Sequence, residues 1–393
     1  MGPFPVIVVI PTYWTWPTGT FSRAGDVIYD RPTPVDLPGS LSHILQGLAA
    51  QRGAPPFAVW VITSTVNARL DAAAESAVEA IISPFREAFP IAQFAHPDLQ
   101  ALRRSLVAQG LQLNIDLRGY PNVRNLQLII PYLLGAETVV FLGDEAFPGE
   151  DYLARATTLI GQRQGEKEVM AVSGLYSDWP QEVGEEGNIF SQENALMRQS
   201  IEALESRPGR LVESHLAFGD NMVLHRSLFC QVPFDPHITR GEDVDYLINA
   251  RLTGRRFFLD KELKIAHHSP EEHRISPYLR LRQNVFRFIY EREKLLAARR
   301  EPDLAPLEPS ELDPYPGRFL REDVISQARR ALEIAFAGES EKPEQIIQAA
   351  LALAQGAAPS YFAFLRAWPK VLATLGHGGT LRSYLERKLQ NKK

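Results

Sequence analysis

The sequence predicts an α/β protein in which a mixed, mostly parallel sheet is flanked by helices and followed by a helical C-terminal appendage. Up to about residue 269, short runs rich in β-branched residues alternate with longer stretches of helical spacing, a pattern typical of a parallel sheet covered by helices. After Pro270 the strand pattern stops, and Leu, Ala, Arg and Glu recur at helical intervals. We therefore expect a sheet domain at residues 1–270 and a helical region at residues 271–393.

The composition is that of an ordinary globular protein. Of the 393 residues, 45% are hydrophobic and 23% are charged, so the chain is long enough for a large domain with an appendage and too apolar to be disordered. Its formal net charge of −5 argues against nucleic acid as a partner. The single cysteine, Cys230, excludes an internal disulfide framework and a cysteine-rich zinc site, and a reducing cytoplasm is the expected location.

The strand candidates are short apolar runs. The first, Val6–Ile10, is too short to span a membrane and leads into Thr12–Gly39, a segment rich in Pro, Gly, Trp and Tyr that we expect to be a functional loop. A helix with Ser40 as its N-cap is expected at Leu41–Gln51. The further strand candidates are Phe57–Thr63, Leu111–Ile115, Thr138–Leu142, Val169–Gly174, Asn221–Leu224, Phe257–Leu259 and Lys264–Ala266.

In the C-terminal region, apolar residues recur on one face of each expected helix. One helix is expected around Tyr278–Ile289, where the apolar spacing is regular. The segment Glu301–Gly317 contains five prolines and is expected to be an extended linker. The further helix candidates are Arg321–Ala337, Pro343–Ala354, Ser360–Leu375 and Thr380–Leu389.

An acidic pair follows the strand candidate Thr138–Leu142, which runs directly into Gly143-Asp144-Glu145. In open parallel sheets, ligands bind at the carboxyl ends of strands. Two adjacent carboxylates suit Mg²⁺ or Mn²⁺ shared with a substrate diphosphate, which such an ion would neutralise. For the pair taken alone, a solvated turn after a strand is the alternative interpretation.

Arg124 stands near the start of the helix expected after Gly119-Tyr120-Pro121-Asn122-Val123. An arginine at a helix start can hold a phosphate or a carboxylate by charge-assisted hydrogen bonds. A surface arginine at that position is the alternative interpretation.

Two further motifs lie far downstream. In Arg240-Gly241-Glu242-Asp243, a carboxylate within reach of a hydroxyl group can act as general base, and Asp243 is the first candidate, with Glu242 second. Acidic residues at a helix start are also favoured by the helix dipole alone. His267 and His268 end a strand candidate, and one of them is a candidate metal ligand beside two carboxylates; a polar strand end is the alternative.

In this order, the motifs resemble those of the GT-A fold glycosyltransferases, especially family 2 and its relatives that make sugar-glycerate or peptide-linked products. The resemblance covers about Phe4–Ser269. Its motifs are Ile10-Pro11-Thr12-Tyr13, Arg124-Asn125, Phe141-Leu142-Gly143-Asp144-Glu145 at the Asp-X-Asp segment of the family, Gly219-Asp220-Asn221 with Arg226, Arg240-Gly241-Glu242-Asp243 with Arg251 and Gly254, and His267 or His268.

The resemblance implies a role for each matching residue. Asp243 would be the acceptor-side base of an inverting enzyme, with Glu242 beside it. The implied nucleotide-sugar site consists of Pro11, Thr12 and Tyr13 around the base, together with Ser64, Arg124, Asp144, Gly219 and Asp220. The implied metal site consists of Asp144, Glu145, His268 and His267.

Two positions depart from the family pattern. Ser64-Thr65-Val66-Asn67 follows the second strand candidate, where the family has an Asp that reads the base. Gly143 occupies the first position of the Asp-X-Asp segment, which leaves two of its acidic positions. Trp14 and Trp16 in the long loop are candidates either for stacking on a sugar or base or for core packing.

The expected function is metal-dependent transfer of a hexose from a UDP- or GDP-sugar to a hydroxyl acceptor, with Mn²⁺ or Mg²⁺ as cofactor. A nucleotidyltransferase-like enzyme is a weaker hypothesis, because Pro11-Thr12-Tyr13-Trp14 stands where that class has its glycine-rich phosphate loop. A non-catalytic GT-A protein that binds sugar nucleotides is the third hypothesis. Peripheral contact of the arginine-rich helical tail with a membrane and formation of a homodimer are candidate interactions, and nucleic acid is not an expected partner.

Overall fold

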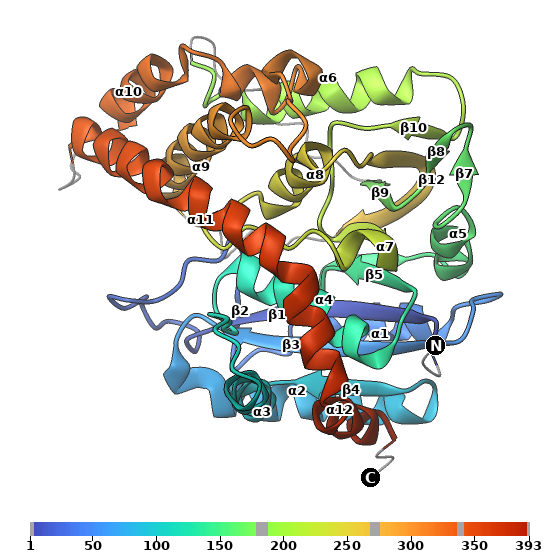
Figure 1. Cartoon of the computed structure of the whole chain (residues 1–393). Helices are drawn as coiled ribbons and strands as arrows, with labels where there is room; N and C mark the ends of the chain where they lie inside the picture. Colours follow the sequence, from blue (N-terminus) through green and yellow to red (C-terminus); the bar gives the residue numbers. More distant parts are fainter. Residues whose placement is uncertain (1–3, 178–187, 268–275, 336–341, 391–393) are drawn as a thin grey trace.

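The fold is built on a mixed, mostly parallel sheet, as the sequence predicts (Figure 1). The computed structural model describes residues 4–177, 188–267, 276–335 and 342–390, without the side chain of residue 267. The main sheet contains β1 (Val6–Thr15), β2 (Thr33–Pro34), β3 (Phe57–Thr65), β4 (Ile91–Phe94), β5 (Thr138–Leu142), β6 (Ala146–Pro148), β9 (Ala171–Tyr176), β10 (Leu211–Glu213), β11 (Asn221–His225) and β12 (Phe258–His267). A separate two-stranded ribbon contains β7 (Arg163–Gln164) and β8 (Lys167–Glu168).

The order of strands along the sheet is β10-β12-β9-β11-β5-β1-β3-β4. The four strands β5, β1, β3 and β4 are parallel to one another, so their carboxyl ends lie along one edge. β11 is antiparallel to both of its neighbours, β5 and β9, and the start of β11 therefore lies beside the end of β5. Asn221 pairs with Leu142 in this register, so the residues just before β11 face those just after β5.

Helices cover both faces of the sheet. The helices of the first two thirds of the chain are α1 (Leu41–Ala49), α2 (Asp71–Ile82), α3 (His96–Ala108), α4 (Tyr120–Leu134), α5 (Tyr152–Thr158), α6 (Glu193–Glu205), α7 (Arg226–Phe229) and α8 (Glu242–Leu252). The helices that follow are α9 (Pro277–Ala298), α10 (Val324–Ala335), α11 (Pro343–His377) and α12 (Thr380–Gln390).

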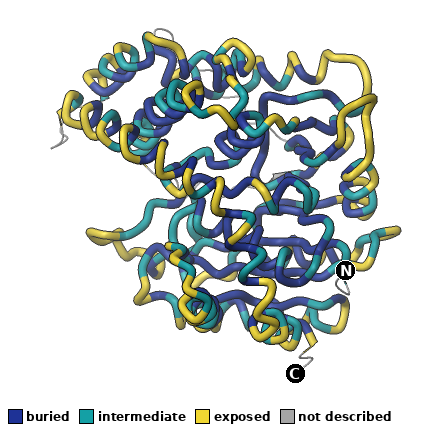
Figure 2. The backbone as a smooth tube through the Cα atoms, in the orientation of Figure 1, coloured by how far each residue is buried: buried dark blue, intermediate teal, exposed yellow. Residues whose placement is uncertain are grey.

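Alternate residues of β1 enter two different hydrophobic cores, one on each face of the sheet. Ile7 and Val9 pack with residues of α3, α4 and α8, whereas Val8 and Ile10 pack with residues of α1, α2 and α5. All four side chains are fully buried, and Figure 2 shows the strands as the buried centre of the molecule. The period-2 alternation of a strand explains this division.

The C-terminal helices share the first of these cores. α11 runs diagonally across the molecule, and it contacts α9 and α10 in one part and α4 in another (Figure 1). On α9, Lys294 is completely buried between Asp235, at 2.9 Å, and Asp245 of α8. The hydroxyl group of Tyr361 on α11 donates to the carbonyl oxygen of Pro233 at 3.0 Å. These contacts join the helical region to the sheet region. Because a buried charge is costly without partners, Lys294 can stay buried only while both carboxylates lie beside it.

The predicted strand at Leu111–Ile115 is wrong, and a strand was missed at Ile91–Phe94. Residues 111–116 have no regular structure, and Ile115 and Leu117 contribute buried side chains to the core without pairing to a strand. The edge position beside β3 is taken by β4, a four-residue strand that is too short to show a clear alternation. The predicted strands Phe257–Leu259 and Lys264–Ala266 are parts of β12, which has an irregular register between Leu259 and Lys264.

Two predictions in the helical region are also wrong. The predicted helices Pro343–Ala354 and Ser360–Leu375 form the single helix α11, which continues through Pro359 and Pro369. Packing of α11 along α9, α10 and α4 compensates for the hydrogen bonds that the prolines cannot donate. The segment expected as an extended linker contains the short 3-10 helix Pro309–Leu312 and buries Leu312 and Tyr315 in the core. At α1, Ser40 holds the N-cap position without a capping hydrogen bond from its side chain.

Candidate functional site

A cleft of about 990 Å³ opens at the carboxyl ends of β1 and β5. Among the described residues that line it, five are arginines and seven are acidic, so the formal charge of these side chains is negative. The arginines are Arg31, Arg124, Arg240, Arg280 and Arg287. The acidic residues are Asp30, Asp144, Glu145, Glu193, Asp220, Glu242 and Asp243. The motifs that are far apart in the sequence therefore meet at one place.

Three carboxylates lie near the end of β5 and act on one another electrostatically, although they do not converge in the arrangement of a metal site. Burial and the nearby carboxylates of Glu145 and Asp220 raise the pKa of Asp144 well above its ordinary value. Asp220 approaches because the antiparallel register of β11 places it opposite Gly143. A Cβ atom at Gly143 would lie only 2.6 Å from Cγ of Asp220. Gly143 thus makes room for a third carboxylate, which comes from the turn before β11.

Arg124 lies in the cleft but is held by the protein itself. Its side chain is only 5% exposed, with Nε donating to Glu242 at 3.0 Å and Nη2 donating to Asp220 at 3.0 Å. Nη1 donates to the carbonyl oxygen of Gly219 at 3.0 Å and to Gln127 at 3.3 Å. These contacts connect α4, α8 and the turn before β11, and they use four of the five N–H donors that the sequence suggested for a phosphate.

Asp243 and Glu242 begin α8 at the wall of the cleft. Asp243 accepts a hydrogen bond from the backbone N–H of Gly219 at 2.9 Å, which fixes its carboxylate next to Asp220. Glu242 is buried against Arg124, and burial raises its pKa despite the opposing effect of that guanidinium group. Gly241 adopts a φ of +68°, and the guanidinium group of Arg287 lies where its Cβ would be. Only glycine satisfies both conditions at this N-cap.

Aromatic residues form another wall. The rings of Tyr13 and Tyr29 have centroids 4.4 Å apart, and Tyr120 meets both edge-on at 5.0 and 5.1 Å. Tyr13 and Tyr120 line the cleft together with Pro11. Two of the three residues expected around a base, Pro11 and Tyr13, are therefore in the cleft.

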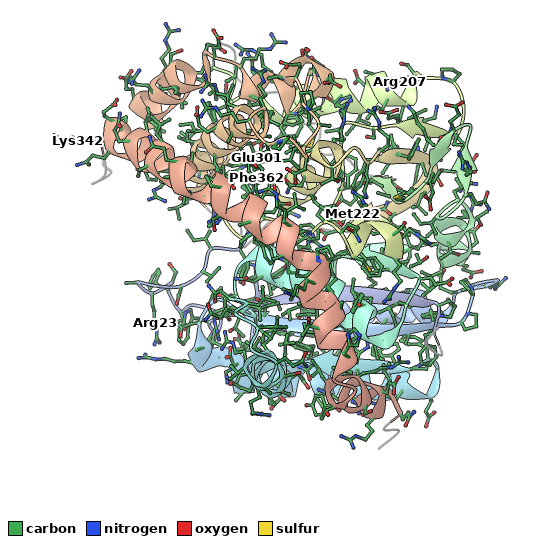
Figure 3. The ribbon with its side chains drawn as sticks, in the orientation of Figure 1. Arg23, Arg207, Met222, Glu301, Lys342 and Phe362 are labelled. Carbon is green, nitrogen blue, oxygen red and sulfur yellow. The ribbon has the colours of Figure 1, made fainter. Side chains whose placement is uncertain are left out.

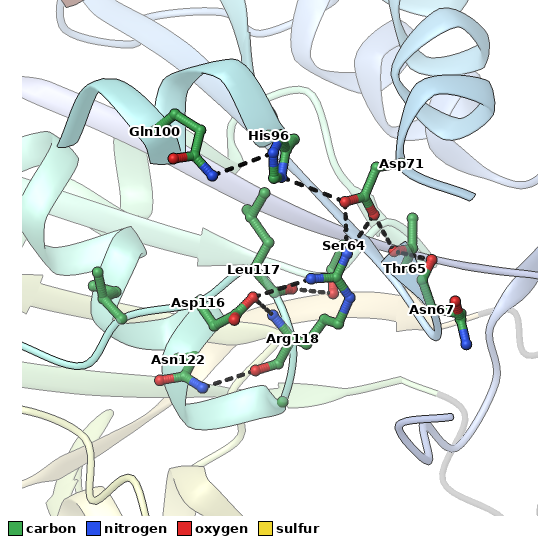
Figure 4. A network of polar contacts seen from close by, with 12 residues as sticks. Ser64, Thr65, Asn67, Asp71, His96, Gln100, Asp116, Leu117, Arg118 and Asn122 are labelled. Carbon is green, nitrogen blue, oxygen red and sulfur yellow. Dashed lines mark hydrogen bonds and ion pairs between the residues drawn. The ribbon is translucent and has the colours of Figure 1, made fainter. Parts of the chain in front are cut away.

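Thr12 and Ser64 do not line the cleft, although both were expected to belong to the site. Thr12 points to the other face of the sheet, where its hydroxyl group accepts a hydrogen bond from Trp14 at 2.9 Å. Ser64 is fully buried, shares a 2.7 Å hydrogen bond with the hydroxyl group of Tyr29 and donates to the carbonyl oxygen of Leu117. Figure 4 shows Ser64 within a structural polar network at the end of β3.

The same polar network connects the end of β3 with the segment before α4. Arg118 forms an ion pair with Asp71 at 2.6 Å and with Asp116 at 3.3 Å, and Asp71 also accepts a hydrogen bond from Thr65 (Figure 4).

Trp14 and Trp16 are core residues, with 2% and 7% exposure, so neither is placed for stacking on a ligand.

The predicted histidine ligands cannot be placed. The backbone at position 267 pairs with Ala146 in β12, but the side chain of His267 and all of His268 lie outside the described residues. Within the described part of the chain, no group of three or more His, Cys, Asp or Glu side chains has the arrangement of a metal site. No described helix is long and apolar enough to cross a membrane.

Sequence reasoning missed Asp30, Arg31, Arg240, Arg280 and Arg287 as residues of the cleft. Asp30 and Arg31 come from the long loop between β1 and β2, and their only sequence signal was the unusual length of that loop. Arg280 and Arg287 belong to α9, one after another on the same helix face, in a region that the sequence assigned to an appendage.

No protein-family model matches the chain, and no curated protein matches it. The chain is similar to the solved structure of the mannosyltransferase PcManGT from Pyrobaculum calidifontis in complex with GDP-Man and Mn²⁺, at 16% identity and a TM-score of 0.44, covering 96% of this chain and 87% of that one. It is also similar to TarS of S. aureus, at 14% identity and a TM-score of 0.40, covering 92% of this chain and 55% of that one. A mycobacterial protein gives 16% identity and a TM-score of 0.39, covering 74% of this chain and 75% of that one. At these values none of the three similarities fixes an activity for this chain.

Proposed function

We propose that this protein is a GT-A, family 2-like glycosyltransferase that moves a sugar from a nucleoside diphosphate sugar to a hydroxyl group, with Mn²⁺ or Mg²⁺ bound by Asp144 and Glu145. One observation carries the proposal. Asp144, Glu145 and Asp220 all line one cleft at the carboxyl ends of parallel strands, which is where open α/β sheets bind ligands.

The carboxylates fit a divalent cation by their chemistry. Burial and two neighbouring carboxylates oppose ionisation of Asp144, and a cation relieves that opposition. Oxygen ligands from one or two carboxylates, completed by water and phosphate, are what Mg²⁺ prefers. When bound, such an ion supplies charge neutralisation to the departing nucleoside diphosphate.

The remaining residues of the cleft have separate tasks in this proposal. Asp243 takes the proton of the acceptor hydroxyl group as that oxygen attacks the anomeric carbon and the nucleoside diphosphate leaves. Its hydrogen bond from the N–H of Gly219 keeps its carboxylate oriented for this task. Glu242 is a positioning residue rather than a second base, because its carboxylate is held by Arg124. Pro11 and Tyr13 border the nucleotide, which we expect to be UDP or GDP.

Ligand-dependent thermal stability tests the binding part of the proposal. UDP and GDP, each with and without Mn²⁺, are added to the folded protein. A ligand at one hundred times its Kd stabilises by about 2.7 kcal/mol, which corresponds to about 3 °C for a chain of this length. The proposal expects one nucleotide to give such a shift in the presence of Mn²⁺, and no response to either nucleotide with either metal would refute it.

Variants locate the metal site. Asp144→Asn and Glu145→Gln should remove the metal-dependent part of the shift, because each replaces a charged ligand by a weaker neutral one. Glu166→Gln is a matched control, since Glu166 is exposed and lies outside the cleft. If all three variants keep the same metal-dependent shift, the metal is bound elsewhere.

Release of sugar from a panel of UDP- and GDP-sugars separates an enzyme from a non-catalytic binding protein. The proposal expects slow metal-dependent hydrolysis of one donor, with water in place of the acceptor. Asp243→Asn should lower that rate by about 100-fold or more while donor affinity stays within a few-fold of the wild type. If the protein binds a nucleotide but neither hydrolyses a sugar donor nor transfers its sugar to any hydroxyl acceptor, it is a binding protein and not an enzyme.

A further inference from the structure

The long loop between β1 and β2 carries a charged pair, Asp30-Arg31, into the cleft. Asp30 forms an ion pair with Arg240, which precedes α8. Arg31 forms an ion pair with Glu145, which follows β5, with Nη1 and Oε2 3.2 Å apart. Two adjacent loop residues thus connect to opposite sides of the cleft.

The backbone of this pair is held in place by buried contacts. The hydroxyl group of Tyr29 accepts a hydrogen bond from the N–H of Gly119 at 2.8 Å and shares another with Ser64. The N–H of Asp30 donates to the hydroxyl group of Tyr120 at 2.8 Å. Further from the cleft, Trp16 donates to Asp26 at 2.8 Å. These contacts hold the backbone that leads into Arg31.

Arg31 differs in two respects from Arg124 and Arg287, the two most deeply buried arginines of the cleft. Its side chain is 29% exposed, whereas Arg124 is 5% exposed and Arg287 is 2% exposed, each of them bound to buried carboxylates. Its partner Glu145 is also one of the two residues that we expect to hold the cation. Glu145 is itself only 14% exposed, so a guanidinium group and a metal ion would meet the same side of one carboxylate.

We propose that Arg31 is the residue that binds the diphosphate of the donor, and that it competes with the divalent cation for Glu145 when no nucleotide is present. This inference rests on the function proposed above. Arg124, to which the sequence assigned the nucleotide contact, already uses four of its five N–H donors on Glu242, Asp220, Gln127 and the carbonyl oxygen of Gly219. A guanidinium fork fits two phosphate oxygens at once, so transfer of Glu145 to the cation leaves Arg31 with a better partner in the diphosphate.

The consequence is an effect of opposite sign on two ligands. Removing the guanidinium group takes away one competitor for Glu145, so binding of Mn²⁺ alone should become tighter. The same change removes a charge-assisted contact to phosphate, so binding of the nucleotide in saturating Mn²⁺ should become weaker. A purely structural role for Arg31 predicts that both affinities fall together.

Calorimetric titration of the full chain with MnCl₂ alone, and then with UDP or GDP in saturating Mn²⁺, measures both effects. Arg31→Gln should bind Mn²⁺ about three- to tenfold more tightly, as for loss of one partly buried competing ion pair. It should bind the nucleotide about tenfold or more weakly, as for loss of one charge-assisted contact. Arg31→Lys keeps the charge but lacks the guanidinium fork, so it should restore the Mn²⁺ affinity to within about threefold of the wild type and the nucleotide affinity only in part.

Two controls separate this effect from general electrostatics and from loop damage. Arg280→Gln removes another exposed cation of the same cleft that has no contact to Glu145, and both affinities should change less than about twofold. Arg23→Gln alters the outer part of the same loop, where Cζ of Arg23 lies 3.7 Å from the ring centroid of Trp16 and neither residue lines the cleft. Figure 3 shows Arg23 at the edge of the molecule, and its replacement should also change both affinities less than about twofold.

Each outcome decides between the two proposals. Opposite changes in Arg31→Gln with rescue of the Mn²⁺ affinity by Arg31→Lys support the role of Arg31. Equal weakening of both ligands, no change in either, or the same changes in Arg280→Gln overturn it while leaving the glycosyltransferase proposal intact. If the wild-type protein binds neither Mn²⁺ nor any nucleotide, the proposed function fails first, and the role of Arg31 falls with it.

Discussion

Replacement of Gly143 by alanine would place a methyl group against the carboxylate of Asp220. The added Cβ would lie 2.6 Å from Cγ of Asp220 and 2.9 Å from its Cβ and Oδ2, well inside the usual separation of non-bonded atoms. Asp220 is not free to move away, because Arg124 donates to it at 3.0 Å. Overpacking of this kind costs about 1–3 kcal/mol, and loss of an ion pair to a carboxylate that is one-third exposed adds at most about 1 kcal/mol.

The resulting loss of about 1–4 kcal/mol corresponds to a fall in Tm of about 1–5 °C, since unfolding entropy is roughly 2 cal/mol/K per residue over 393 residues. Differential scanning calorimetry measures it, with Gly356→Ala as control. A Cβ at Gly356 meets no atom within 4 Å and sits inside α11, so Tm should stay or rise slightly. Gly143→Ala should also lose its Mn²⁺-dependent nucleotide shift, because displacement of Asp220 disturbs the carboxylate cluster.

A double-mutant cycle with Asp220→Gly tests the cause directly. Removing the side chain of Asp220 removes all three close contacts. Gly143→Ala should therefore reduce stability by at least about 1 kcal/mol less in the Asp220→Gly background than in the wild type. Additive effects, or a Gly143→Ala protein with wild-type Tm, would refute the steric account of this glycine.

Three other predictions follow from buried groups. Arg124→Gln should lower the free energy of unfolding by about 3–5 kcal/mol, because it leaves the carboxylate of Glu242 buried without its guanidinium partner. Calorimetry measures this loss, and a much smaller loss would indicate that Arg124 binds a ligand after all. Ser64→Ala should cost about 1–2 kcal/mol by leaving Tyr29 and the carbonyl oxygen of Leu117 with fewer partners, yet nucleotide affinity by calorimetric titration should not change. Burial lowers the pKa of His215 from 6.5 to about 4. As pH falls, the imidazole of His215 is therefore protonated in the unfolded chain before it is protonated in the folded protein. Its contribution to stability is fully present above pH 6.5, and about 1–3 kcal/mol of it is lost as pH falls towards 4. His215→Leu should lose less Tm than the wild type between pH 7 and 4.5, and an equal loss in both would contradict the assignment.

The pattern of short apolar runs was enough to predict the sheet, because a buried strand must be continuously apolar and its carboxyl end must leave the core. Thr138–Leu142 is a strand with the predicted bounds, and Asp144 and Glu145 follow it into the cleft. Helices with regular apolar spacing, such as Pro277–Ala298, were likewise predictable from local periodicity. The short strand Ile91–Phe94 was not, because four residues carry too little pattern.

Only the tertiary structure showed which individual side chains point into the cleft. Pro11 and Tyr13 line the cleft, while Thr12 between them points away, because successive residues of a strand face opposite sides. The sequence indicated that Arg124 would bind an anion but could not show that Glu242, 118 residues later, supplies that anion.

The sequence by itself determined that this chain has an α/β fold in which carboxylates follow the end of a strand, because those features depend on local apolar patterning. Only the tertiary structure decided which charges meet there. The antiparallel register of β11 brings Asp220 beside Gly143, and a long loop brings Arg31 to Glu145. Such contacts join residues far apart in the chain, and no local pattern encodes them.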